Sequence, residues 1–228
     1  MRRRHSDAHE ERSWLDQRGA EVDGGAQSVA AEAEETSDPV EIIQRGAHGG
    51  LTIATAESLT AGSLAARLAD VPGASAVLLG GVVAYCNEVK HHLLAVDAEL
   101  LESRGAVDPA VAAAMARGAA AATGADIGIA TTGVAGPAPH EGKDVGTVYL
   151  GLACSDEAVQ RLGLRLPDDC VEDLEYASDG EGAPWSAGSL LLNLDGDRAG
   201  IREASVEGAL KLIDDFLHTE PSGIGEPR

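Results

Sequence analysis

The sequence predicts a layered α/β domain, in which helices cover a central sheet. The first observation is that short apolar runs typical of buried strands alternate along the chain with segments of helical spacing. The second is the composition: 44% of the 228 residues are hydrophobic but only 3% are aromatic, so Ala, Val, Leu and Gly must form most of the core. This apolar content excludes a wholly disordered chain.

The beginning of the chain differs in composition from the rest. Residues 1–38 are charged and rich in Ala, Gly and Ser, and we expect them to form a disordered acidic extension. Their basic start is not followed by an apolar segment, so no secretory signal is expected. No run of about 18 apolar residues occurs anywhere, so we expect no transmembrane helix.

The regular elements begin at Pro39. Apolar residues at helical spacing predict a first helix, which ends at Gly49 and Gly50. Residues 51–55 form a short apolar run typical of a buried strand, and the polar segment 56–62 leads into the next helix. The elements predicted next are helix 63–70, strand 76–85 with a bend or bulge at Gly80-Gly81, and helices 87–94 and 97–103.

A long Ala-rich helix is predicted over residues 108–122. Asp108 is a good cap, Pro109 suits the first helical position, and Gly124 closes the helix. The segments predicted after it are strand 126–131, a Gly- and Pro-containing loop 133–144, strand 145–153, a weaker strand 159–166, an acidic surface insertion 167–188, strand 190–194, an amphipathic helix from Asp197 and a flexible tail 220–228.

The two loops 56–62 and 131–137 are the candidate site, because ligands of α/β folds usually bind where loops leave the strand ends. Ser58 lies between a buried strand and a helix, which resembles the placement of a nucleophile elbow, although the G-x-S-x-G pattern is absent. The alternative is that Ser58 or Thr60 simply caps the helix. Position alone favours the cap, because caps are much commoner than catalytic serines.

A catalytic serine needs a base, and neither loop contains a histidine. Lys90 follows a buried strand, and a lysine beside apolar surface has a lowered pKa and can accept a proton from serine. The alternative is an ordinary solvated lysine on a helix. His91 and His92 are neighbours on that helix and point in different directions, so they do not predict a metal site.

The cysteines give no sign of a disulfide framework or a zinc site. Cys86, Cys154 and Cys170 are odd in number and lack a CxxC spacing. A reducing cytoplasm therefore fits the sequence best.

Several segments have the residues, order and spacing of one known family. They are AESLTAG at 56–62, VPGAS at 71–75, GVVAYCNEVK at 81–90, GAV at 105–107, TGVAGP at 132–137 and VGTVY at 145–149. Together they resemble the CinA C-terminal domain family from about residue 39 to 153, and again from Gly196-Asp197-Arg198. The resemblance implies a single α/β/α domain at 39–219 with a mixed central sheet.

The resemblance also implies an activity, that of a cytoplasmic nicotinamide-nucleotide amidase. Such enzymes hydrolyse nicotinamide mononucleotide to nicotinate mononucleotide and ammonia in NAD recycling. The implied catalytic residues are Ser58 as nucleophile, Lys90 as base and Thr132 as the residue that orients them. The implied substrate-binding residues are Glu57, Thr60, Ala61, Gly62, Tyr85, Asn87, Gly133, Gly136 and Pro137. The resemblance implies no metal and no cofactor, and it suggests a homodimer.

The segment 60–62 carries one further expectation. We expect its backbone N–H groups to stabilise an oxyanion, although the same helix start could instead bind a phosphate. Ala61 stands where the family usually has Gly, which could crowd this turn. Two other departures are the Ala-Pro-His sequence at 138–140 and Asp144 in place of Pro.

Two alternatives to an amidase come from different classes of protein. One is a non-catalytic CinA-like interaction protein linked to competence or the DNA-damage response. The other is a nucleotide-binding module without hydrolysis, which would need the pocket but not Lys90. Release of ammonia from nicotinamide mononucleotide would distinguish the amidase from both.

The charge excludes one class of partner. Seventeen basic and 38 acidic residues give a net charge of -21, which repels nucleic-acid backbones. The scarcity of lysine beside many acidic residues resembles the proteome of a salt-loving microbe. An ordinary acidic, highly soluble protein is the alternative.

Overall fold

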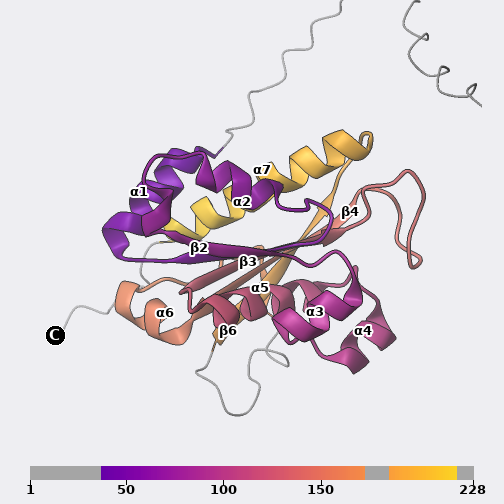
Figure 1. Ribbon diagram of the computed structural model, residues 1–228, viewed down its shortest axis with the longest axis horizontal. Helices are drawn as coiled ribbons and strands as arrows, with labels where there is room; N and C mark the ends of the chain where they lie inside the picture. The colour runs from indigo at the N-terminus through magenta and orange to yellow at the C-terminus, as the bar shows by residue number, and fades with distance from the viewer. Residues whose placement is uncertain (1–36, 173–184, 220–228) are drawn as a thin grey trace, which may run out of the picture. The chain divides into compact units, whose positions relative to one another are not determined.

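The computed structural model describes residues 37–172 and 185–219 (Figure 1). Residues 1–36 of the expected extension, the middle of the expected insertion and the expected tail lie outside the described residues.

The predicted layered α/β fold with a mixed sheet is confirmed. The strands are β1 (Ile53–Glu57), β2 (Leu78–Val83), β3 (Ile127–Gly133), β4 (Thr147–Ser155), β5 (Val171–Glu172) and β6 (Trp185–Asn193). They form one six-stranded sheet in the order β2-β1-β3-β4-β6-β5. Strand β1 is parallel to β2 and β3, and the remaining neighbours pair antiparallel.

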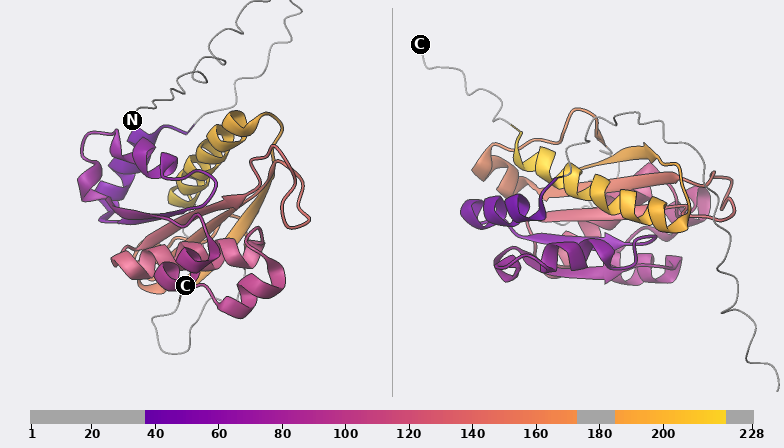
Figure 2. Two further views of the ribbon diagram at one scale, coloured as in Figure 1. Left: turned by 45° about the vertical axis from the view of Figure 1, so that its right-hand side comes forward. Right: turned by 90° about the horizontal axis from the view of Figure 1, so that it is seen from above.

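Helices cover both faces of the sheet (Figures 1 and 2). They are α1 (Pro39–Gly49), α2 (Ser63–Ala69), α3 (Asn87–Leu94), α4 (Ala98–Arg104), α5 (Pro109–Thr123), α6 (Asp156–Leu162) and α7 (Arg198–Leu217). Helices α1, α2 and α7 lie over one face, where Ile and Leu side chains dominate the core. Helices α3, α4 and α5 lie over the other face, where most of the core side chains are Ala.

Helix α5 lies unusually close to the sheet. A Cβ atom at Gly128 of β3 would be 1.8 Å from the carbonyl oxygen of Ala116, and one at Gly151 of β4 would be 2.0 Å from that of Ala112. Only glycine fits where two backbones approach so closely. The low aromatic content of the sequence is thus accommodated by close contact between small residues.

One predicted element is wrong. Residues 159–166 do not form a strand, because α6 occupies residues 156–162. The Ser155 hydroxyl accepts a hydrogen bond from Ala158 N–H, two acidic residues occupy the first turn, and Gly163 ends the helix in a left-handed conformation. The expected insertion is also shorter than predicted in its described part, because β5 lies within it and β6 already begins at Trp185.

The strand directions bring several loops to one edge of the sheet. Strands β1, β2 and β3 are parallel, and β6 points the same way because it is antiparallel to β4. The segments that follow these four strands therefore emerge together.

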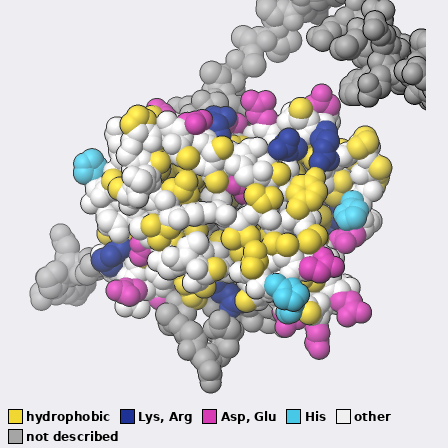
Figure 3. All heavy atoms as spheres, in the orientation of Figure 1, with side chains coloured by type: hydrophobic (Ala, Val, Ile, Leu, Met, Phe, Trp, Pro, Cys, Tyr) yellow, Lys and Arg dark blue, Asp and Glu magenta, His cyan; other side chains and the backbone are white. Residues whose placement is uncertain are grey.

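The surface around this frame is mixed in character. The face in Figure 3 carries hydrophobic side chains across its middle and acidic side chains around much of its rim. Part of the exposed apolar surface belongs to edge strand β2, whose Leu79 and Val83 are nearly half exposed. Among the described residues, no helix is both long and apolar enough to span a bilayer.

Candidate active site

A pocket of about 640 Å³ lies where the segments following β1, β2 and β3 meet the start of α7. Its lining includes the two residues predicted to form a catalytic pair, Ser58 and Lys90, and the predicted third residue, Thr132. Residues far apart in the sequence thus come together at the carboxyl edge of the parallel strands.

Ser58 and Lys90 are in contact. The Lys90 side-chain nitrogen, Nζ, lies 3.3 Å from Ser58 Oγ and 2.9 Å from the carbonyl oxygen of Ala84. Ser58 follows β1 directly, and its N–H donates to the Thr131 carbonyl, which ties the residue to β3. Lys90 reaches the serine from the first turn of α3, so two rigid elements determine the geometry of the pair.

Lys90 is buried, with 1% of its surface exposed. This burial lowers the pKa of Lys90 from its ordinary 10.5, because the charged ammonium loses its hydration. Electrostatic interactions with Cys86 and Glu141 act in the opposite direction without reversing the shift. The structure thus contradicts the alternative of a solvated helix lysine and gives Lys90 the environment of a general base.

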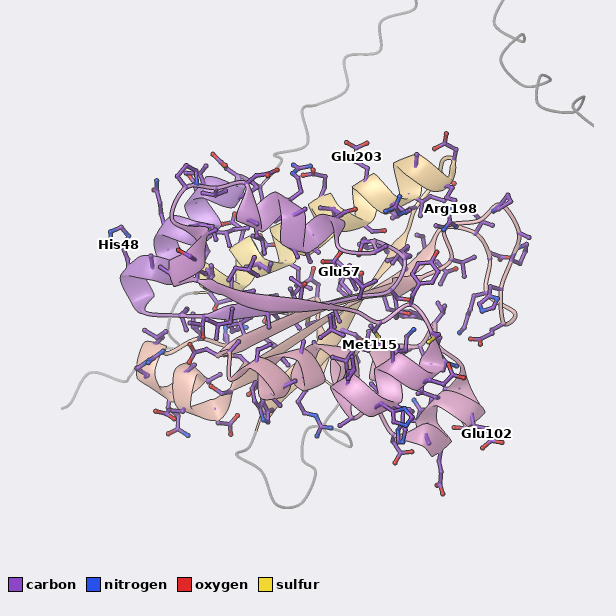
Figure 4. The ribbon with its side chains drawn as sticks, in the orientation of Figure 1. His48, Glu57, Glu102, Met115, Arg198 and Glu203 are labelled. Atoms are coloured by element: carbon purple, nitrogen blue, oxygen red, sulfur yellow. The ribbon has the colours of Figure 1, made fainter. Side chains whose placement is uncertain are left out.

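Glu57 is not among the residues that line the pocket. Its carboxylate is buried and accepts hydrogen bonds from the N–H groups of Gly62, Leu64 and Ala65 at 2.8, 3.0 and 2.9 Å. Figure 4 shows Glu57 between the sheet and α2. The side chain therefore caps α2.

The turn between Ser58 and α2 contains a residue in a strained backbone conformation. Ala61 has a φ of +53°, in the left-handed region that favours glycine. Glycine suits this conformation better than alanine does. The turn nevertheless forms with alanine, and the Ala61 N–H donates to the Ser58 carbonyl at 3.2 Å.

The oxyanion donors predicted across residues 60–62 need correction. The N–H groups of Ala61 and Gly62 are engaged by Ser58 and Glu57, as described above. Within the described part of the chain, the N–H groups of Leu59 and Thr60 donate no hydrogen bond. Of these two residues Leu59 lines the pocket and Thr60 does not, so the Leu59 N–H, directly after the serine, is the available donor.

The two threonines expected near the pair have other contacts. Thr132 Oγ1 donates to the Ala106 carbonyl at 2.7 Å and forms no recorded hydrogen bond with Ser58 or Lys90 in the described structure. Thr132 lines the pocket, but the expectation that it orients the pair is not supported. Thr60 is fully buried, with its hydroxyl 2.7 Å from that of Thr131.

The other predicted binding residues and two that sequence analysis missed form the mouth of the pocket. Tyr85, Asn87, Gly133, Gly136 and Pro137 all line it. The missed residues are Arg198 and Glu141.

Arg198 is positioned by two hydrogen bonds. Its guanidinium donates to the Tyr85 hydroxyl and to the Gly136 carbonyl, each at 2.8 Å. Figure 4 shows Arg198 at the start of α7, beside the loop between β3 and β4. The Gly196-Asp197-Arg198 match was the only sequence signal for it. Glu141 accepts from the Ala106 N–H at 2.7 Å and had no sequence signal.

One group of side chains with the spacing of metal ligands lies outside the pocket. Among the described residues, the side chains close enough together to hold an ion are Glu41 of α1, Asp214 of α7 and His218 just after it. None of these lines the pocket.

The fold and the site together define an α/β protein with a serine–lysine pair at the carboxyl edge of its parallel strands. The sequence matches the family model of the CinA C-terminal domain over residues 36–174. The chain therefore belongs to the CinA C-terminal domain family.

Relatives and solved structures agree with this assignment. The chain is 54% identical over 136 residues to a CinA-like protein of Frankia casuarinae, covering 60% of this chain and 30% of that protein. It is 40% identical over 191 residues to a putative competence-damage inducible protein of Desulforamulus reducens, covering 84% of this chain and 39% of that protein. The chain thus spans well under half of these relatives.

The match with this chain covers almost the full length of the solved structures. A competence-damaged protein (CinA) superfamily protein from Klebsiella pneumoniae superposes with a TM-score of 0.63 at 27% identity, covering 78% of this chain and 94% of that one. A competence/damage inducible protein from Agrobacterium tumefaciens superposes with a TM-score of 0.60 at 29% identity, covering 80% and 96%.

Proposed function

We propose that the protein is a serine amidase that hydrolyses the carboxamide of nicotinamide mononucleotide. The observation that carries the proposal is the contact between a buried lysine of lowered pKa and a serine at a strand-to-helix turn. A serine hydroxyl is a weak nucleophile unless an adjacent base accepts its proton, and Lys90 is such a base.

The reaction proceeds in two halves. Ser58 Oγ attacks the carboxamide carbon while neutral Lys90 takes the hydroxyl proton, giving a tetrahedral oxyanion. Collapse of this intermediate breaks the C–N bond as Lys90 returns the proton to the departing nitrogen. Ammonia departs, and an acyl-enzyme remains. Water then attacks the ester as Lys90 accepts a proton. Cleavage of the C–Oγ bond returns that proton to Ser58 and releases the carboxylic acid, which then loses its own proton to water.

The charges of the pocket fit a substrate with both signs of charge. Arg198 is exposed at the mouth and can pair with a phosphate through two parallel N–H groups. The carboxylate of Glu141 belongs to the same lining and suits the positive pyridinium ring. That ring withdraws electrons from its carboxamide, which makes the carbonyl carbon more reactive toward Ser58.

The test is ammonia release from nicotinamide mononucleotide by the purified wild type and Ser58→Ala. We expect wild-type turnover, and a loss of several orders of magnitude in kcat for Ser58→Ala, because the covalent route is removed. Circular dichroism and the thermal midpoint serve as folding controls. Equal turnover by a folded Ser58→Ala would exclude the covalent mechanism, and a wild type that releases no ammonia would exclude this substrate.

A further inference from the structure

Arg202 lies behind the loop that follows the serine. It belongs to α7, one helical turn after Arg198, so both side chains project from the same side of that helix. Arg198 reaches the pocket, whereas Arg202 is partly buried and points at residues 59–63. It does not line the pocket itself.

Arg202 binds two successive backbone carbonyls. Its Nε donates to the Leu59 oxygen at 2.9 Å, and its Nη2 donates to the Thr60 oxygen at 3.0 Å. The same Nη2 lies 3.4 Å from the Ser63 hydroxyl. A guanidinium suits this task, because its donors stand at a fixed separation in one plane.

These contacts act on the Leu59 N–H through the turn. In a planar trans peptide the C=O and N–H bonds point opposite ways. Arg202 holds the Thr60 carbonyl, so the Ala61 N–H of the same peptide points away from Arg202 and donates to the Ser58 carbonyl at 3.2 Å. The Ser58 carbonyl is thereby held inside the turn, and the Leu59 N–H of the same peptide points out of it, on a residue that lines the pocket.

The loop needs such a restraint. Ala61 adopts the left-handed region without being glycine, which strains the turn. Without a contact from outside, the peptides around it would gain by relaxing toward a commoner turn. We propose that Arg202 is a positioning residue, which holds the turn 58–61 so that the Leu59 N–H can stabilise the oxyanion. This inference rests on the proposed amidase function.

The test compares Arg202→Met, Arg202→Lys and the control Arg67→Met. Arg67 of α2 and Arg202 line the same groove between α2 and α7. Arg67, however, pairs with Glu207 at 2.8 Å and has no recorded contact with residues 58–62. We expect Arg202→Met to lower kcat for nicotinamide mononucleotide by about 100-fold, the usual effect of losing an oxyanion donor. The KM should stay unchanged, and so should the pH at which kcat/KM rises as Lys90 loses its proton.

Rescue by lysine separates positioning from folding. Arg202→Lys keeps a charged donor within reach of one carbonyl and should recover part of kcat, whereas Arg67→Met should match the wild type. Rates are counted per reactive serine, titrated with a fluorophosphonate reagent, so that unfolded protein does not contribute. The proposal is overturned if Arg202→Met keeps full kcat per titrated serine, changes only KM, or equals Arg202→Lys.

A second measurement keeps this test independent of the substrate. Phosphonylation of Ser58 by the same reagent is also faster when N–H donors stabilise the developing oxyanion, and its rate can be measured without the substrate. If the wild type releases no ammonia but labels at least about ten times faster than Arg202→Met, the substrate is wrong and the positioning role stands. Equal labelling rates, or a wild-type Ser58 that does not label, would overturn the role of Arg202.

Discussion

The residue that most constrains the chemistry is Lys90. A fully buried lysine is unusual, because losing the hydration of its ammonium group is costly. Here the side chain has two oxygen partners, Ser58 Oγ and the Ala84 carbonyl, and no direct carboxylate partner is recorded among the described residues. Such an environment favours the neutral amine, which is the form that can accept a proton.

Exchange of this lysine tests the role directly. Lys90→Arg should lose about as much kcat as Lys90→Ala, of order 10²-fold or more, because arginine keeps its proton at any working pH. Initial rates of ammonia release by both variants, measured beside the wild type, check this. Substantial activity in Lys90→Arg would instead make the position an electrostatic anchor.

The pH profile of the wild type follows from the same shift. The neutral fraction of Lys90 increases with pH, so kcat/KM should rise through a limb centred below the ordinary lysine pKa of 10.5. A profile that falls over this range would contradict a lysine base.

At this scale the sequence predicted the pair but not its surroundings. Ser58 and Lys90 lie in motifs whose spacing is visible along the chain, so both could be proposed. The competition for backbone N–H groups around Glu57 could not be seen, because it depends on how the turn folds back onto α2. Arg198 and Arg202 come from the last helix, more than 100 residues beyond Ser58, and only the direction of β6 brings them to the loop.

At the scale of elements, the start of α2 depends on one distant side chain. The residue before the helix is Gly62, which has no side chain to cap it, and Glu57 supplies the acceptors from the end of β1. A charged acceptor at a helix N-terminus also interacts favourably with the helix dipole. The link fastens α2 to the strand that carries Ser58.

Glu57→Gln should therefore destabilise the fold by about 1–3 kcal/mol, because a buried charged acceptor becomes a neutral amide with one acceptor oxygen. Urea unfolding measures the free energy. The matched control is Glu203→Gln, an exposed position on α7 (Figure 4), which should change it by less than about 0.5 kcal/mol. If both variants unfold alike, the cap contributes little.

Most elements could be predicted because their ends carry strong local signals. Asp38, Asp97, Asp108 and Asp197 all cap the helices that follow them. Helix α6 was missed because it is short and its apolar residues also suit a strand, although Ser155 and Gly163 mark its ends. The β5 and β6 pairing was hidden inside an acidic segment, where composition favours a loop over the pairing found.

For the whole molecule, electrostatics acts against compactness. With a net charge of -21, acidic groups repel one another across the surface, and compact states suffer more from this than expanded ones. The recorded surface ion pairs, such as Arg67–Glu207 and Lys211–Asp215, are exposed and contribute little.

The midpoint of thermal unfolding should thus rise with salt. The Debye length falls from about 10 Å at 0.1 M to about 3 Å at 1 M, so most of the repulsion should be screened by 1 M. A gain beyond 1 M that is larger in sulfate than in chloride at equal ionic strength would come from stronger apolar burial. A midpoint that stays constant from 0.1 M to several molar salt would contradict the hypothesis that the protein is adapted to high salt.

The close approach of α5 to the sheet gives the two faces unequal freedom to diverge. On the α1, α2 and α7 side, Ile, Leu and Val can exchange for one another with modest repacking. On the α5 side, Gly128 and Gly151 touch backbone oxygens and leave no volume for any side chain. Evolution can redesign one half of this core residue by residue, whereas the other half can change only by moving the helix as a whole.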